Sequence, residues 1–246
     1  MKIAYAIFLV ALSISAASKL EAQAEITPGQ RLANEMRQTQ LLNYERISGT
    51  LRTKGRRGKR TSVALTLQTA VVDGQWQSIF RTVNPQTSTI NELTIVRGPD
   101  QAPRYFSAEG QNGSLDNGVE LSREEVMTPF SASEFWVADL GLEFFYWPSQ
   151  VILKNAKIKM RKGISCYVLE SRSEQSDGIG YSRVRSWISR DHGGLIYAEA
   201  YGDDGKRIKT FEVSDVEKID GEWKLKELRI RNEKARATTE LEFNNR

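Results

Sequence analysis

The feature that most constrains the fold is a long series of short segments in which apolar and polar residues alternate. The stretch 61–67 places Val63, Leu65 and Leu67 on one side, which is the pattern of a strand with one buried face. Asp-Gly and Asn-Pro pairs between the segments are typical turn signals. The series predicts an antiparallel meander of about a dozen strands in a mainly β protein, with one sheet face in water and the other apolar. Strands are expected at about 61–67, 76–83, 93–96, 151–160, 164–171, 181–189, 195–201, 206–216, 223–232 and 238–243.

Helices are expected before the first strand and in the middle of the chain. Thr27-Pro28 has the order of an N-cap hydroxyl followed by proline, which predicts a helix from about Pro28 to Tyr44. Ser122–Glu125 and Ser131–Glu134 both have the spacing of a capping box, so a short helix is expected to start at each. If the sheet is open and strongly curved, these helices can cover its concave face.

An aromatic segment follows the second capping-box pattern. Residues 135–147 hold six aromatic side chains, in a chain that is 9% aromatic. Gly141 and Pro148 interrupt any continuous helix there. These side chains either form ordinary core or line an apolar groove, in which each buried one contributes roughly 1.5–3 kcal/mol. The groove candidates are Leu32, Met36, Leu65, Leu67, Trp76, Trp136, Leu140, Phe144, Phe145, Tyr146 and Trp147.

One short stretch makes the chain basic. Six positive charges and no acid lie between residues 52 and 60, while the whole chain carries only +4. The stretch is expected to contact an anionic surface, or else to be a charged hairpin tip that resists aggregation. Nucleic acid is disfavoured as a partner, since no aromatic residue interleaves these charges to stack on bases. The residues are Arg52, Lys54, Arg56, Arg57, Lys59 and Arg60.

The N-terminus predicts export. Met1-Lys2, the apolar run Ile3–Ala17 and the small-x-small sequence Ala22-Gln23-Ala24 are the parts of a secretory signal peptide. We expect residues 1–24 to be removed, leaving 25–246 as a single domain that is exported and released soluble. An uncleaved anchor helix is the alternative, although serine and lysine residues interrupt the apolar run. No later stretch approaches the roughly 20 apolar residues of a membrane helix.

Catalytic and metal chemistry have few residues to use. The chain has one histidine, His192, in an Asp-His-Gly-Gly turn, and one cysteine, Cys166, in an apolar strand. Cys166 is expected to be a buried, unreactive thiol. Two such residues cannot supply a typical transition-metal site, and no nucleophile elbow or zinc motif is present. We therefore expect no enzyme activity, no cofactor and no metal. The one remaining catalytic option is a carboxylate pair, either Glu124 and Glu125 or Asp139 and Glu143.

The order and spacing of several segments resemble the bacterial outer-membrane lipoprotein-sorting protein family, a LolA-like group. The resemblance runs from about Thr27 to Phe243 and implies an unclosed antiparallel β-barrel, a half-pipe of about 11–12 strands. An N-terminal helix and short central helices would cover its concave face. It also implies a carrier for acyl chains of lipoproteins or other lipids. The segments that carry it are 139–148, 166–170, 181–188, 201–213 and 220–223.

Three functions follow as hypotheses. The first is a periplasmic, non-enzymatic carrier that binds acyl chains in an apolar groove for transfer towards the outer membrane. Its contacts with membranes would be transient, and an inner-membrane exporter or an outer-membrane acceptor would be its partner. The second is an envelope adaptor or structural protein that docks a partner through the aromatic segment. The third is a carboxylate-based envelope hydrolase.

Overall fold

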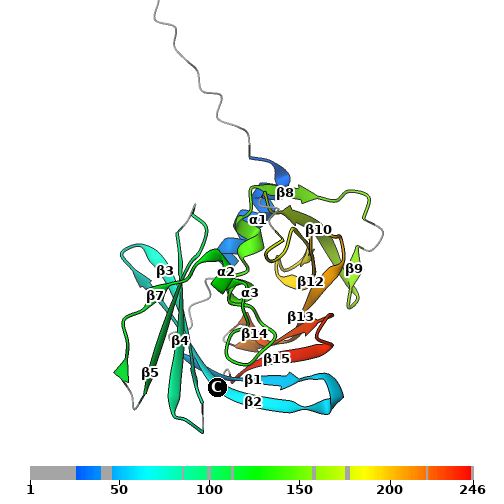
Figure 1. Ribbon diagram of the computed structural model, residues 1–246. Helices are drawn as coiled ribbons and strands as arrows, with labels where there is room; N and C mark the ends of the chain where they lie inside the picture. The colour runs from blue at the N-terminus through cyan, green and yellow to red at the C-terminus, as the bar shows by residue number, and fades with distance from the viewer. Residues whose placement is uncertain are drawn as a thin grey trace, which may run out of the picture.

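One antiparallel sheet forms most of the molecule (Figure 1). The computed structural model describes residues 26–39, 46–84, 86–98, 101–111, 114–156, 159–174, 178–219 and 221–244. The predicted signal peptide therefore lies outside the described residues. The strands are β1 (Ile47–Lys54), β2 (Arg60–Val72), β3 (Gln75–Val83), β4 (Thr89–Arg97), β5 (Arg104–Gln111), β6 (Ser114–Leu115), β7 (Val119–Glu120), β8 (Ser149–Ile152), β9 (Met160–Arg161), β10 (Ile164–Arg172), β11 (Arg183–Ser189), β12 (Leu195–Tyr201), β13 (Arg207–Ile219), β14 (Glu222–Asn232) and β15 (Ala237–Asn244).

The sheet is curved but does not close. Its order is β6-β5-β4-β3-β2-β1-β15-β14-β13-β12-β11-β10-β8, with β7 added on β5 and β9 on β10. The first and last strands of this order do not pair, so the predicted unclosed antiparallel barrel is confirmed. Three of the fifteen strands have only two residues, and the remaining twelve agree with the predicted number.

The two halves of the sheet meet where β1 pairs with both β2 and β15. Leu51 lies opposite Val63 on β2 and Leu241 on β15. Because side chains alternate between sheet faces, this register places all three on the inner, concave side. Leu51 and Leu241 are almost completely buried there, so the first and last strands share one core.

Short helices lie over the concave face (Figure 1). The helix α1 (Pro28–Thr39) begins as predicted, with the Gln30 amide donating to the Thr27 hydroxyl at 3.2 Å. The predicted continuation to Tyr44 lies outside the described residues. The helix α2 (Arg123–Val126) has the predicted capping box, formed by Ser122 and Glu125. None of the described helices is long and apolar enough to cross a bilayer.

Two predicted elements are wrong. Residues 131–134 form a turn instead of a helix start, because Ser131 and Ala132 adopt left-handed φ angles of 46° and 55°. The helix α3 begins after them (Val137–Gly141) and is followed by the 3₁₀ helix η2 (Glu143–Tyr146). The predicted strand at 151–160 ends at Ile152, where a turn leads away from the sheet. The strands β1 and β5 are not among the predicted ranges.

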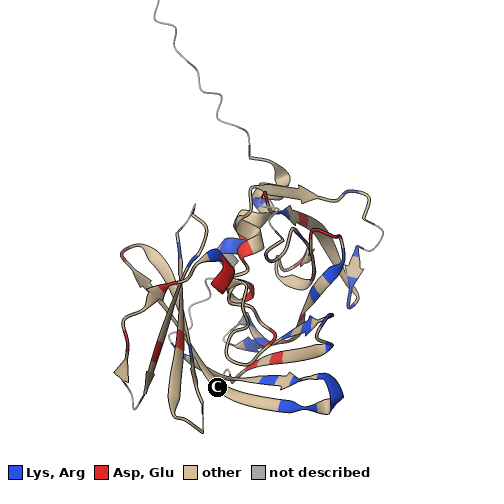
Figure 2. Cartoon of the chain, viewed as in Figure 1, with Lys and Arg blue, Asp and Glu red and all other residues tan. Residues whose placement is uncertain are grey.

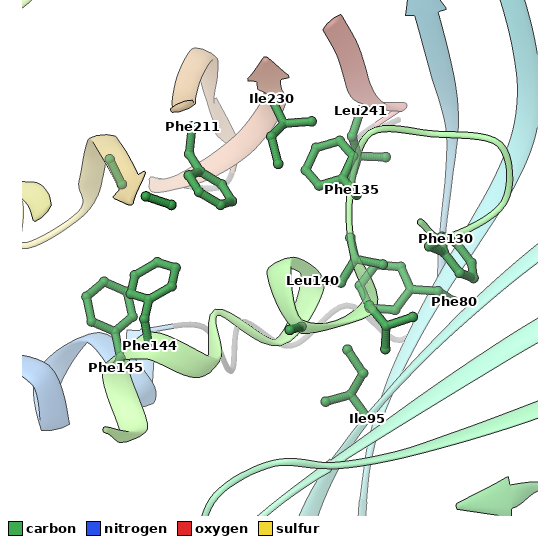
Figure 3. Packing of buried hydrophobic residues seen from close by; sticks show 14 of the residues in the cluster. Phe80, Ile95, Phe130, Phe135, Leu140, Phe144, Phe145, Phe211, Ile230 and Leu241 are labelled. Carbon is green, nitrogen blue, oxygen red and sulfur yellow. The ribbon is translucent and has the colours of Figure 1, made fainter. Parts of the chain in front are cut away.

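Most of the buried apolar side chains lie between the concave face and these helices (Figure 3). A second, smaller cluster of Cys166, Val168 and Trp187 is buried separately. It lies on the outer face, opposite the core residue Leu169, which follows from strand alternation on β10. The expected division into one wet and one apolar face is therefore wrong for this part of the sheet. The prediction that Cys166 is buried is confirmed, and its burial raises the pKa of the thiol.

Substitution of Ile230 tests how much the packing of the concave face contributes to the free energy of unfolding. Ile230 on β14 is completely buried in the main cluster. Ile230→Ala should lower the free energy of unfolding by about 2–5 kcal/mol, since it leaves a cavity in a packed core. Val216→Ala on β13 is the control, because Val216 is 45% exposed and should change stability by less than about 0.5 kcal/mol. Urea unfolding measures both, and equal effects would contradict the assignment of the inner face as core.

Candidate functional site

The concave face is covered by one continuous segment, residues 122–147, which we call the plug. It contains α2, α3 and η2. Its apolar side chains point into the sheet, and Phe135, Phe144 and Phe145 are each at most 2% exposed. Figure 3 shows Phe144 and Phe145 near Phe211 of β13, and Leu140 between them and Phe80 of β3. The predicted aromatic segment therefore faces the interior of the half-pipe.

A break in the plug lets adjacent aromatic residues face the same way. Leu142 between α3 and η2 adopts a left-handed φ of 44°, so the chain changes direction there. In a continuous helix Phe144 and Phe145 would point about 100° apart, but here the Phe145 ring packs at 4.6 Å from the Phe144 ring. Gly141 precedes the break, where any side chain would collide with the hydroxyl of Tyr105 on β5.

The structure brings most of the predicted groove residues together. Trp136 and Trp147 are partly buried against the main cluster. Tyr146 is half-buried, with the guanidinium of Arg37 from α1 lying 4.6 Å above its ring. Trp76 on β3 is half-buried outside that cluster, opposite Arg97 of β4. The residues within the buried cluster are Leu32, Met36, Leu65, Leu67, Leu140, Phe144 and Phe145.

A fully buried ion pair fastens the plug to the sheet. The Nζ atom of Lys209 on β13 lies 2.8 Å from Oδ2 of Asp139 on α3, and both side chains are at most 1% exposed. The Tyr181 hydroxyl donates to Oδ1 of Asp139 at 2.8 Å, and the Trp136 amide donates to Oδ2 at 2.7 Å. Lys209 also lies 3.7 Å from the centre of the Trp136 ring, which stacks on Tyr181. We call these four residues the latch.

Burial and the neighbouring carboxylate have opposite effects on the protonation of Lys209 in the latch. Burial lowers the pKa of Lys209, although the carboxylate of Asp139 opposes this shift. Burial also raises the pKa of Tyr181 well above its usual value, so the phenol stays a donor at neutral pH. The ammonium thus gains a carboxylate and an aromatic face in place of water. One further acid, Glu143 in η2, has its pKa raised by burial beside Tyr105 and Trp147.

Sequence reasoning missed the latch. Lys209 lies at an inward position of an alternating strand, two residues before Phe211. A charged residue at an apolar position of such a pattern indicates a buried partner. That signal identifies Lys209 but not Asp139, because the partner is 70 residues away along the chain.

The basic stretch forms the tip of the β1–β2 hairpin, closed by the 3₁₀ helix η1 (Arg56–Gly58). Figure 2 shows this tip as a blue end projecting from the sheet. Arg52 differs from the others, since it forms an ion pair with Glu242 on β15. The β14–β15 turn adds Lys234 and Arg236 beside the tip, because Lys54 pairs with Thr238. The other predicted residues, Lys54, Arg56, Arg57, Lys59 and Arg60, are exposed.

Several solved structures share the fold of this chain. A DUF1329 family protein from Desulfovibrio piger has a TM-score of 0.70 at 19% identity, over 89% of this chain and 91% of that chain. A domain named for outer membrane lipoprotein sorting, from Vibrio parahaemolyticus, has a TM-score of 0.66 at 17% identity, over 88% of this chain and 90% of that chain. A LolA superfamily protein from Nitrosomonas europaea has a TM-score of 0.62 at 14% identity, over 88% of this chain and 91% of that chain. The fold is therefore LolA-like.

Sequence comparison adds a family. A family model described as "uncharacterized protein" matches residues 114–246, which include the plug from α2 onward and every strand from β8 to β15. No curated protein matches the sequence.

The latch should be strongly coupled energetically. Asp139→Asn leaves a buried ammonium without its carboxylate and should lower the free energy of unfolding by about 3–5 kcal/mol. Adding Lys209→Met removes that unpaired charge. The double variant should then be about 1–3 kcal/mol more stable than the sum of the single effects. Chemical unfolding of the four proteins gives this coupling energy, and simple additivity would show that the two side chains do not act as a pair.

Proposed function

Since the chain belongs to the family whose model matches residues 114–246 and has the LolA-like fold, we propose that it is a non-enzymatic periplasmic carrier of acyl chains. The cargo is a lipoprotein or another lipid on its way to the outer membrane. The observation that carries this proposal is the apolar concave face, covered by a plug whose aromatic side chains face inward. An acyl chain needs such a surface and little else.

The plug is suited to leave the concave face and return. Its helices α2, α3 and η2 have four, five and four residues, too few to be stable alone. They are held by tertiary contacts, of which the latch is the most specific. In a carrier, opening costs only a few kcal/mol, because a larger cost would prevent uptake and release. Acyl chains then replace the plug side chains against Leu65 and Leu67 of β2.

The inward orientation of the aromatic segment favours a carrier over an adaptor. An adaptor that docks through Trp136, Phe144 and Phe145 would present them outward, whereas they pack against the concave core. A hydrolase is less favoured, because the carboxylate of Asp139 is engaged by Lys209 and by two hydrogen-bond donors.

The first test is native mass spectrometry of the mature chain, residues 25–246, purified from the periplasm without detergent. We expect an added mass that disappears on solvent extraction and is identified as a lipid or an acylated peptide. If the protein stays free of added mass after incubation with lipids and lipoproteins, the carrier proposal fails.

A fluorescent fatty-acid probe tests the groove itself. Phe145 is a poor site for substitution, because it is completely buried and a charge there would unfold the protein. Trp147 is half-buried at the end of the plug. Trp147→Asp should weaken probe binding by at least about 10-fold, the equivalent of one lost aromatic contact. Val151→Asp on β8 is the matched control, since Val151 is 50% exposed. Equal binding by both variants, with circular dichroism unchanged, would contradict the groove assignment.

The basic tip is proposed to contact anionic membrane surfaces during transfer. Arg56→Glu/Arg57→Glu should weaken association with phosphatidylglycerol vesicles by at least about 30-fold at low salt, since each lost arginine removes roughly 1 kcal/mol and the new glutamates add repulsion. The effect should become small at high salt, because exposed charges are screened. Lys218→Glu/Lys226→Glu makes the same charge change on the β13–β14 hairpin, whose turn lies at the opposite strand end. Vesicle co-sedimentation compares them, and a similar loss in both would show that only net charge matters.

A further inference from the structure

The concave face holds a second buried cation, Arg97 at the end of β4, which the latch does not involve. Its side chain is 5% exposed. Its Nη2 donates to the hydroxyl of Ser78 on β3 at 2.8 Å. Its Nε and Nη1 atoms are buried and find no hydrogen-bond partner among the residues that the structure describes. A guanidinium has five N–H donors in a planar fork, so most of its bonding capacity is unused.

The groups that face Arg97 are neutral. They are the phenols of Tyr105 on β5 and Tyr146 in the plug, whose pKa values are raised by burial. Within the described ranges, no carboxylate forms an ion pair with Arg97, whereas Lys209 in the same concave face has Asp139. A second guanidinium, Arg37 of α1, lies over the Tyr146 ring.

A buried charge without a counter-charge is unfavourable by several kcal/mol. Burial lowers the pKa of Arg97, but a guanidinium remains protonated at physiological pH. A buried guanidinium that has no ion-pair partner among the described residues is explained if an anion arrives from outside. The guanidinium fork fits a phosphate or a carboxylate in bidentate geometry.

The neighbours of Arg97 supply a path for an acyl chain. Ser78 lies beside Ile95 on β4, and the next inward residue on β3 is Phe80. Phe80 is paired with Leu93 on one side and with Leu67 on the other. The polar end of the inner face, at Arg97 and Ser78, is therefore continuous with an apolar row that crosses three strands.

From this arrangement we infer that Arg97 and Ser78 form an anion-binding subsite for the head group of the cargo. The inference rests on the proposed carrier function and narrows the cargo to an amphiphile with a phosphate or a carboxylate next to its acyl chains. The plug covers the subsite in the closed protein. When the plug moves, Tyr146 leaves Arg97, the head group binds the guanidinium, and the acyl chain lies along Phe80, Leu93 and Leu67.

The test compares ligands that differ in the charge of the head group and in the number of acyl chains. Dioleoylphosphatidylglycerol and oleate carry a phosphate and a carboxylate, dioleoylglycerol has the same chains without charge, and inorganic phosphate has no chain. Binding to the mature protein is measured by competition against a fluorescent neutral lipid and by native mass spectrometry. Wild type should prefer the two anionic ligands over dioleoylglycerol by about 10- to 100-fold, which corresponds to charge-assisted hydrogen bonds.

Three variants separate head-group binding from structure. Arg97→Met should abolish the preference for anionic ligands while binding of dioleoylglycerol is unchanged, and Arg97→Lys should restore part of it. Without ligand, Arg97→Met should have an equal or higher Tm, because an uncompensated buried charge is removed. Arg81→Met is the control on the neighbouring strand β3, where the arginine is paired with Glu92 of β4 and faces outward. It should leave the preference intact.

These measurements distinguish failure of the head-group subsite from failure of the carrier proposal itself. If wild type binds none of the lipids, the carrier function itself fails, and the inference fails with it. If wild type and Arg97→Met bind charged and neutral lipids alike, the carrier stands and the head-group subsite is wrong. A fall in Tm for Arg97→Met with equal loss of all ligands would assign Arg97 a structural role. Arg97-dependent binding of inorganic phosphate alone, without lipid binding, would indicate a site for a free anion instead of cargo.

Discussion

The whole molecule depends on how the apolar concave face of an open sheet is kept out of water. A closed barrel of this size would bury its inner side chains by strand pairing alone. Here the sheet stops at β6 and β8, so the inner face needs a cover. The plug and α1 supply it, and their side chains merge with those of the strands into one cluster. Stability and access to the concave face are therefore set by the same contacts.

Most contacts between the plug and the sheet are apolar, and the latch is a buried polar contact among them. Apolar packing gives the plug affinity for the sheet but little positional preference, since hydrophobic contact is non-directional. The bond from Lys209 to Asp139, with Tyr181 and the Trp136 amide on the same carboxylate, fixes where α3 lies. Buried ion pairs add little net stability but specify one arrangement. The latch thus defines the closed state more than it strengthens it.

Several features of the plug work against a permanently closed state. Ser131, Ala132 and Leu142 have left-handed backbone angles, each of which is unfavourable by roughly 1–3 kcal/mol. The carboxyl of Glu143 is buried, which raises its pKa. Arg97 adds a cation beneath the plug with two unused donor atoms. Together these features would lower the free-energy difference between the closed form and the open form that the proposed carrier function requires.

Much of the fold could be predicted from the sequence, because strand alternation and turn residues are local properties. The inward positions of Val63, Leu65 and Leu67, the start of α1 at Pro28 and the capping box at Ser122 all follow from neighbouring residues. The same local rules failed at Ser131, where the spacing of a capping box occurs in a turn. The strand predicted at 93–96 ended one residue before Arg97, and so excluded the cation proposed to bind the head group.

What the sequence determined by itself is therefore the class of structure: a mainly β meander, an inward-facing apolar set and an exposed basic hairpin. Only the tertiary structure decided which charges are buried and which have partners. Asp139 and Lys209 are 70 residues apart in the chain, and Arg97 on β4 donates to Ser78 on β3. The energy of a buried charge depends on groups brought together by folding, which no local pattern records. The chemistry inside the half-pipe is for that reason a property of the fold.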